Sequence, residues 1–464
     1  MPPSRRIGSG GVTAVAQAGT EGLKGRRKAI LGWCLYDWAM SAFNTVIGTF
    51  VFSRYFTDAV AGDPAQGTQQ WGMALGISGI IVAILSPVVG AIGDRGGRAK
   101  PWLAVLTTVC VLATAALYWV RPDAAYIPLA LLAMAVASTA FELSYVFYNA
   151  LLPVAAPPGY AGRVSGWGWG LGYFGGLGSL ILCLVLLVQT DAPLFGLIGK
   201  EEAEHVRATA LLVAVWYALF AIPLFLLAPD RPSVDKPAGR IVREGLAALA
   251  DTVRHVRSYG NTVRYLIASA LWRDGISTIT AFGGIMAGSL FGMDTAQIIL
   301  FAIMLNVAAG TGAVGFAWVD DRFGAKPTLI ISILGLMVSA TALLLVGTSY
   351  WSWAPMLALP LNWTQEQQWL LLFGLVLGIF FGPAQAAART MVVRISPPGM
   401  ETELFGLYNL TGRAVGMIGP FAYGAATAYW DSQRAGMSTV LVLFTAGLLL
   451  LLTVKEPARR GEAA

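Results

Sequence analysis

The stretch GAIGDRGGRAK, residues 90–100, lies between two apolar runs that are each long enough to cross a lipid bilayer. Gly90 has no side chain, so two helices can approach each other closely there, and Gly96 and Gly97 permit the positive φ that a tight turn needs. Asp94 can accept hydrogen bonds from the free amides that open the next helix, where its charge is also favoured. The turn carries three basic residues that favour the cytoplasmic side of a membrane, Arg95, Arg98 and Lys100.

A shorter version of this turn recurs in the second half of the chain. It reads DRFGAK, residues 321–326, and repeats the acidic, basic and glycine positions. The pattern Gly-x-x-x-Asp-Arg-x-Gly-Arg of the first turn resembles the loop signature of the major facilitator superfamily, and its occurrence in both halves strengthens the resemblance. The alternative is a generic polar hairpin between membrane helices. The residues that we expect to form a gating loop are Gly90, Asp94, Arg95, Gly97, Arg98, Asp321, Arg322 and Gly324.

Composition places the chain in a membrane. Of its 464 residues, 56% are hydrophobic and 12% are charged, whereas a soluble protein carries about 25% charged residues. The apolar residues come in blocks of roughly 20, the length that a bilayer demands of a helix. We therefore predict an all-α membrane protein with twelve transmembrane helices in two pseudo-symmetric six-helix bundles. The predicted spans are 30–56, 71–93, 101–120, 125–150, 164–189, 208–228, 263–290, 296–319, 327–348, 367–390, 402–428 and 436–454.

Lysine and arginine residues set the orientation of these spans. With the N-terminus in the cytoplasm, most of the lysines and arginines fall in cytoplasmic loops and few fall in the loops on the other side. We therefore predict an integral protein of the inner or plasma membrane with both termini cytoplasmic. Because the basic residues lie on one side, the net charge of +6 does not indicate nucleic-acid binding. The predicted domains are a cytoplasmic tail at 1–28, six-helix bundles at 29–228 and 263–454, a cytoplasmic linker at 229–262, and a second tail at 455–464.

The linker has the pattern of an amphipathic helix. Three prolines open the linker and break any helix there. Apolar residues then recur at spacings of three and four, with arginines between them. The apolar positions are Val242, Leu246, Leu249, Val253 and Val256. We predict a helix that lies on the inner leaflet in contact with membrane lipid, and the alternative is a helix that binds a partner protein.

The two halves of the chain share positions at nearly fixed offsets. Residues 157–159, Pro-Pro-Gly, recur 240 residues later at 397–399. Three glycines of the fifth predicted span recur at the same offset in the eleventh, and Asp37 matches Asp274 at an offset of 237. Six plus six helices with internal homology indicate a transporter.

Several predicted spans carry polar residues on one helical face. In the first span, Asp37, Ser41 and Asn44 lie at offsets of four and seven residues, which puts them on the same side. Charge inside a bilayer is costly and usually serves a transport pathway or an ion pair. The candidate substrate- and coupling-site residues are Asp37, Asn44, Glu142, Tyr145, Asn149, Arg273, Asp274, Gln385 and Arg413.

Each of these charges also has a structural interpretation. Asp37 could be capped by backbone amides or paired with an arginine, and Arg413 could pair with a carboxylate instead of contacting the solute. Arg273 and Asp274 are adjacent and point to different faces of their helix, so each needs its own partner. Arg389 lies near the predicted cytoplasmic end of the tenth span, where we expect it to extend to the interface.

Other motifs argue against enzymatic chemistry. The run Gly166–Gly175 contains the pattern Gly-x-Gly-x-x-Gly, which by itself would suggest a nucleotide-binding site. It lies inside a membrane-length apolar segment with no strand before it. Its glycines therefore predict close helix packing instead of nucleotide binding. No catalytic triad, paired carboxylates, metal-ligand cluster or phosphate loop is present, and the three cysteines are not spaced as a metal site. We therefore predict a protein that is not an enzyme, with no cofactor and no metal, and transport that is powered by gradients.

Four further stretches carry a more specific likeness. They are GWCLYDWAMSAF at 32–43, YNALLP at 148–153, GRVSG at 162–166 and WRDG at 272–275. Together they resemble the vacuole effluxer-like branch of the major facilitator superfamily, related to the fungal autophagy-associated amino-acid effluxer, although Met40 stands where an Asn is expected. The resemblance implies a twelve-helix fold with a central cavity and alternating access, and, more loosely, amino-acid efflux.

These features together predict a secondary transporter of a small polar solute, such as an amino acid or a similar zwitterion. Asp37, Glu142 and Asp274 would exchange protons or hold a cation such as Na⁺, and Arg273 and Arg413 would hold an anionic group of the solute. We expect a monomer. The alternatives are an exporter of an amphiphilic compound or drug and, in another class, a non-transporting membrane scaffold or sensor.

Overall fold

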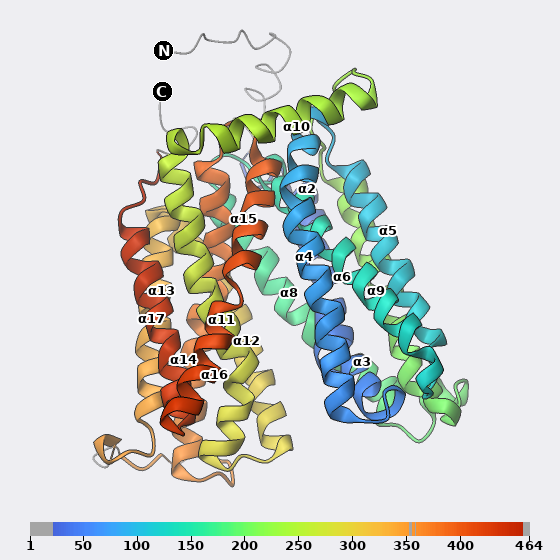
Figure 1. Cartoon of the computed structure of the whole chain (residues 1–464), viewed down its shortest axis with the longest axis vertical. Helices are drawn as coiled ribbons and strands as arrows, with labels where there is room; N and C mark the ends of the chain where they lie inside the picture. Colours follow the sequence, from blue (N-terminus) through green and yellow to red (C-terminus); the bar gives the residue numbers. More distant parts are fainter. Residues whose placement is uncertain (1–21, 352–354, 358, 458–464) are drawn as a thin grey trace.

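The computed structural model describes residues 22–351, 355–357 and 359–457, and every regular element in these ranges is a helix (Figure 1). Two bundles are joined by a linker that carries α10 (Ala238–Arg254). The N-terminal bundle contains α2 (Arg27–Ala42), α4 (Pro64–Gly96), α5 (Lys100–Ala116), α6 (Ile127–Ala150), α8 (Ala161–Cys183) and α9 (Glu204–Leu227). The C-terminal bundle contains α11 (Gly260–Phe291), α12 (Thr295–Phe323), α13 (Ala325–Leu345), α14 (Gln365–Ile395), α15 (Glu401–Val415), α16 (Ile418–Trp430) and α17 (Gln433–Leu452). Most of the predicted N-terminal tail and the last residues of the predicted C-terminal tail lie outside the described ranges.

Nine helices in the described ranges are long and apolar enough to cross a membrane. The other three predicted spans are broken or carry charge. The first consists of α2, a π-helical stretch η1 (Phe43–Phe50) and the short helices α3 (Phe52–Tyr55) and η2 (Phe56–Val60). The seventh is α11, which carries Arg273 and Asp274, and the eleventh is divided into α15 and α16. Interruptions of this kind are tolerated at membrane depth where protein or a water-filled cavity surrounds the backbone.

Glycines on α8 let this helix lie directly against the polar face of α2 and of η1, which continues the same span. A Cβ atom built on Gly168 would lie 2.6 Å from Oδ2 of Asp37, and one built on Gly176 would lie 2.5 Å from Oγ1 of Thr45. Neither position has room for a side chain, so a larger residue would push the two helices apart. The packing predicted for this glycine-rich run is therefore confirmed, and it holds Asp37 firmly in place.

The two bundles meet at the end of the molecule that carries α10, which we call the α10 end. There α4 lies against α15 of the other bundle, and a Cβ atom built on Gly90 would lie 2.5 Å from the carbonyl oxygen of Thr402. In the same way, a Cβ atom built on Gly166 of α8 would lie 2.6 Å from the carbonyl oxygen of Ala313 in α12. The close approach predicted at Gly90 is confirmed, and it joins one bundle to the other.

The helix α10 lies across the ends of both bundles (Figure 1). Gly245 packs on Ile92 of α4, and the hydroxyl of Thr252 donates a hydrogen bond of 2.6 Å to the carboxylate of Glu403 in α15. The exposed apolar side chains of α10 include Val242, Leu246 and Val253. The sequence was therefore correct in predicting a helix here, while the contact of its apolar residues with lipid stays a prediction.

Gly90→Leu should keep α4 and α15 apart, because the new side chain would occupy the place of the Thr402 carbonyl. We expect the α10 end to open and to expose Ser165, which is now fully buried and donates a hydrogen bond to the Ala386 carbonyl across the bundle interface. The measurement is the labelling rate of Ser165→Cys by a polar thiol reagent, in a chain whose three native cysteines are replaced by alanine. A rise of at least about tenfold, a shift of about 1.4 kcal/mol, is expected.

Gly72→Leu is the matched control, because Gly72 lies on the same helix with open space around it. Equal labelling rates in the Gly72 and Gly90 variants would contradict the assignment of Gly90 to the closing contact.

Candidate functional site

A cavity of about 310 Å³ lies between the two bundles. Its lining includes most of the residues predicted for the site, namely Asp37, Asn44, Glu142, Tyr145, Asn149, Arg273 and Gln385. Aromatic side chains complete it, among them Phe141, Trp169, Tyr173, Phe405 and Tyr408. Along the first span, Asp37 is only 5% exposed whereas Asn44 is exposed, so access to solvent increases away from the α10 end. The predicted site residues that line the cavity therefore come from four predicted spans, the first, fourth, seventh and tenth.

The deepest charged group in this cavity is Arg389 of α14. Its Nη1 donates a hydrogen bond of 2.9 Å to Oδ2 of Asp37, and its Nη2 donates one of 2.7 Å to the hydroxyl of Tyr145. The side chains of Arg389 and Asp37 are 3% and 7% exposed. The expectation that Arg389 extends to the membrane interface is wrong, because α14 continues to Ile395 and leaves Arg389 inside the protein.

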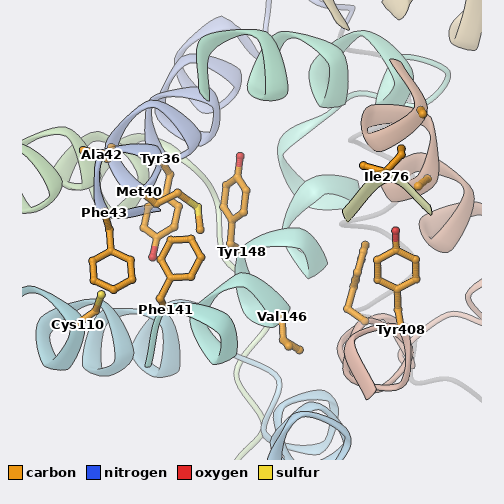
Figure 2. Packing of buried hydrophobic residues seen from close by; sticks show 14 of the residues in the cluster. Tyr36, Met40, Ala42, Phe43, Cys110, Phe141, Val146, Tyr148, Ile276 and Tyr408 are labelled. Atoms are coloured by element: carbon orange, nitrogen blue, oxygen red, sulfur yellow. The ribbon is translucent and has the colours of Figure 1, made fainter. Parts of the chain in front are cut away.

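Aromatic rings surround the Arg389 guanidinium. Its Cζ lies 5.0 to 5.5 Å from the ring centroids of four residues, Trp33, Tyr145, Tyr148 and Trp169. The ring of Tyr148 also stacks on that of Tyr36 at 4.9 Å, and Figure 2 shows the two side chains beside Met40 and Phe141. Cation–π contacts and a paired carboxylate together stabilise a charge that would otherwise be expensive to bury. Arg389 follows Gln385 by four residues, one helical turn, and this spacing is the sequence signal that could have placed Arg389 in the cavity.

A second ion pair joins the two bundles: it links Glu142, which lines the cavity, to Arg413, a predicted site residue that is not among the lining residues. Nη2 of Arg413 in α15 donates a hydrogen bond to Oε1 of Glu142 in α6. The two side chains are 43% and 26% exposed, so protein encloses this pair far less than the Asp37–Arg389 pair. The structural interpretation of Arg413, pairing with a carboxylate of another helix, is therefore the one that the geometry favours.

Arg273 of α11 presents a guanidinium that has no carboxylate partner among the ion pairs of the described residues. Its Cζ lies 4.0 Å from the ring centroid of Tyr408, and its Nη1 reaches the Tyr408 carbonyl at a long 3.5 Å. Because Arg273 also lines the cavity, its remaining donors are available to a bound anionic group.

Asp274 does not belong to the cavity. Its Oδ2 accepts a hydrogen bond of 2.7 Å from the amide of Gly419 in α16, and the residue is 2% exposed. The prediction that it shares the site with Asp37 and Glu142 is wrong, since successive residues on a helix point about 100° apart and Arg273 already faces the cavity.

Asp94 joins the two bundles at the α10 end. Its carboxylate accepts hydrogen bonds from the amides of Thr402 (3.1 Å) and Glu403 (2.8 Å) in the first turn of α15, and it pairs with Arg231 of the linker at 2.6 Å. The backbone amides that open the next helix, α5, donate hydrogen bonds to Asp230 instead. The first of these two bonds is 2.9 Å long. The expectation that Asp94 caps the next helix is wrong, because the close contact of α4 with α15 presents the amides of the other bundle to it.

The second loop repeats this arrangement with the bundles exchanged. Asp321 accepts a hydrogen bond of 3.2 Å from the amide of Arg163, near the start of α8, and pairs with its guanidinium at 3.0 Å. Glu456 accepts the amides of Ala325 and Lys326 that open α13, both at 2.9 Å. Each loop acid thus caps a helix of the opposite bundle, while a second acid caps the next helix along the chain.

The other loop residues shape the turns. Gly97 and Gly324 have φ values of +78° and +110°, which residues with side chains rarely adopt. Arg98 and Arg322 are exposed, and Arg95 is partly exposed. None of the three lines the cavity, so a part for these arginines in gating stays a prediction.

The arrangement of helices is shared with solved transporters. The chain matches the proton:xylose symporter XylE, bound to 6-bromo-6-deoxy-D-glucose, with a TM-score of 0.71 and 15% identity, over 94% of this chain and 97% of that one. It matches the transporter FucP in the outward conformation with a TM-score of 0.66 and 13% identity, over 93% and 99%. The protein therefore has the major facilitator fold, which confirms the predicted fold class.

The family follows from sequence comparison. A family model described as "Vacuole effluxer Atg22 like" matches residues 73–464. The chain is 26% identical to the uncharacterized MFS-type transporter YxiO of Bacillus subtilis (strain 168), over 91% of this chain and 94% of that protein. It is 22% identical to Autophagy-related protein 22 of Coccidioides immitis (strain RS) over 65% of this chain, and it spans about half the length of that relative. The chain belongs to the Atg22-like family of major facilitator transporters, and it is a membrane transporter and not an enzyme.

Arg389→Gln should strongly destabilise the protein, because it leaves the Asp37 carboxylate buried without a counter-charge, a change that costs about 3–5 kcal/mol in buried pairs. Asp37→Asn should cost less, since the guanidinium keeps Tyr145 and its four aromatic rings. The double variant should be more stable than Arg389→Gln alone. Thermal unfolding of the purified protein in detergent measures all three, and wild-type stability of Arg389→Gln would contradict the buried pair.

Proposed function

We propose that this transporter moves a small zwitterionic solute, such as an amino acid, by alternating access. The observation that supports this most is that carboxylates and guanidinium groups from both bundles face one cavity. Asp37 and Glu142 come from the N-terminal bundle, whereas Arg273 and Arg389 come from the C-terminal bundle. A solute that carries both signs of charge can contact both bundles at once, which is what an alternating-access transporter requires of its substrate.

The contacts at the α10 end support a rocking motion of the two bundles. They consist of hydrogen bonds from helix-opening amides to Asp94 and Asp321 and of glycine contacts between helices, and they close the cavity on that side. Contacts of this kind can be broken together, without unfolding either bundle.

We propose that the α10 end faces the cytoplasm of an inner or plasma membrane, because the basic residues gather there. We also propose that the protein works as a monomer.

We further propose that transport is coupled to protons or Na⁺. Asp37 and Glu142 are the acidic side chains of the cavity lining. Glu142 is the more accessible of the two, since its side chain is 26% exposed against 7% for Asp37. Intramembrane carboxylates that face a cavity are typical of proton and cation pathways.

Purified protein in proteoliposomes should take up one or more labelled amino acids, and an imposed pH gradient should change the rate. The measurement is uptake across an amino-acid panel with and without the gradient, and with Na⁺ replaced by choline. Absence of uptake for every amino acid and peptide, together with normal folding, would contradict the proposal.

Glu142→Gln should abolish amino-acid uptake, because it removes the accessible carboxylate while keeping the size of the side chain. The aromatic lining leaves a second candidate, export of an amphiphilic compound. If Glu142→Gln lowers only thermal stability and leaves transport of an amphiphilic dye intact, this second function is favoured.

A further inference from the structure

We infer that Glu142 binds the ammonium group of the transported zwitterion, that Arg273 binds its carboxylate, and that Arg413 is a built-in competitor for Glu142. This inference rests on the proposed function and names the subsites within it. In this structure the guanidinium of Arg413 takes the position on Glu142 that the solute ammonium takes during transport.

The two ion pairs that join the bundles at Asp37 and Glu142 differ in how easily a ligand can replace one partner. Arg389 makes two hydrogen bonds to Asp37 and one to Tyr145, and it is enclosed by aromatic rings. Arg413 makes one hydrogen bond to Glu142, and its side chain is 43% exposed. Exposed ion pairs contribute little to stability because water replaces the partner readily. A solute cation can therefore displace Arg413, whereas Arg389 is fixed.

The two proposed subsites face the same part of α15. The Nδ2 of Asn409 donates a hydrogen bond of 3.4 Å to the backbone carbonyl of Glu142. Arg273 stacks on Tyr408, and a Cβ atom built on Gly412 would lie 3.0 Å from its Nη1. Residues 408 to 412 span little more than one helical turn, about 6 Å along the axis. A single small zwitterion can therefore reach both charged groups.

A further observation indicates a polar ligand in this cavity. Asn149 lines the cavity and is 3% exposed, yet its Oδ1 accepts no hydrogen bond within the described part of the chain. Buried amide oxygens usually have a partner. A solute with hydrogen-bond donors in addition to its charged groups would supply one.

The inferred exchange also explains why the solute should move the bundles. The Glu142–Arg413 pair ties α6 to α15 directly. When a zwitterion replaces Arg413, it links Glu142 of one bundle to Arg273 of the other, so the solute itself becomes the bridge. A carboxylate without an ammonium group contacts only Arg273 and leaves the internal pair intact. Such an analogue should bind without being transported.

The test compares binding of an amino acid and its des-amino analogue, for example phenylalanine and 3-phenylpropionate, to purified full-length variants by calorimetry. We expect Arg413→Gln to tighten amino-acid binding by about three- to tenfold, and Glu142→Gln to weaken it by at least about tenfold. Glu142→Gln should leave the analogue unaffected, while Arg273→Gln should weaken both ligands. Arg54→Gln, which alters an exposed pair between α3 and η2, is the control that should change neither.

The double variant Glu142→Gln/Arg413→Gln separates this mechanism from a structural ion pair. It should bind the amino acid no better than Glu142→Gln alone, because Arg413 acts only through Glu142. If Arg413→Gln weakens amino-acid binding while the protein stays folded, the inference is overturned although the proposed function stands. If the wild-type protein binds no amino acid but transports another solute, the proposed function itself fails.

Discussion

The guanidinium of Arg389 lies between two bundles that both cross the membrane, and it is 3% exposed. A charge in this position must have a counter-charge and hydrogen-bond partners, because removing it from water is expensive. Asp37 supplies the counter-charge from α2, and the glycines of α8 allow α2 to hold it there. Aromatic residues from three helices of the same bundle complete the enclosure. The packing of the N-terminal bundle is therefore arranged around a side chain of the other bundle.

The internal repeat explains how the α10 end closes. Asp94 caps α15 and Asp321 caps α8, so each bundle supplies an acid to a helix of the other. A helix cap of this kind contributes about 0.5–2 kcal/mol, which is enough to favour closure and small enough to be reversed. The linker adds Arg231, which pairs with Asp94, and α10, which touches both α4 and α15. Farther from this end, Asn44 of the cavity lining is exposed.

The charged side chains that line the cavity or join the bundles beside it differ in exposure. This difference separates a structural ion pair from groups that a ligand can contact. The Asp37–Arg389 pair is enclosed and holds the bundles in register, while Glu142 and Arg273 line the cavity and the Glu142–Arg413 pair is partly exposed. A transporter needs both kinds of contact. Enclosed internal pairs keep charge away from lipid, and exposed ones can be exchanged for a ligand.

The sequence by itself determined the helical membrane fold, the repeat, the two loops and the polar faces that meet in the cavity. These features depend on local spacing, since span length, helical periodicity and turn glycines all act within a few residues of one another. It did not determine which charges pair. Arg389 and Asp37 are separated by 352 residues in the chain, and Asp94 caps a helix that begins about 300 residues later. The same spacing rules would have allowed Asp274 into the cavity and Arg389 at the interface. Tertiary packing excluded both placements, since Asp274 bonds to Gly419 of α16 within its own bundle and Arg389 pairs with Asp37 of the other bundle. Partners so distant in the chain leave no periodic signal in it.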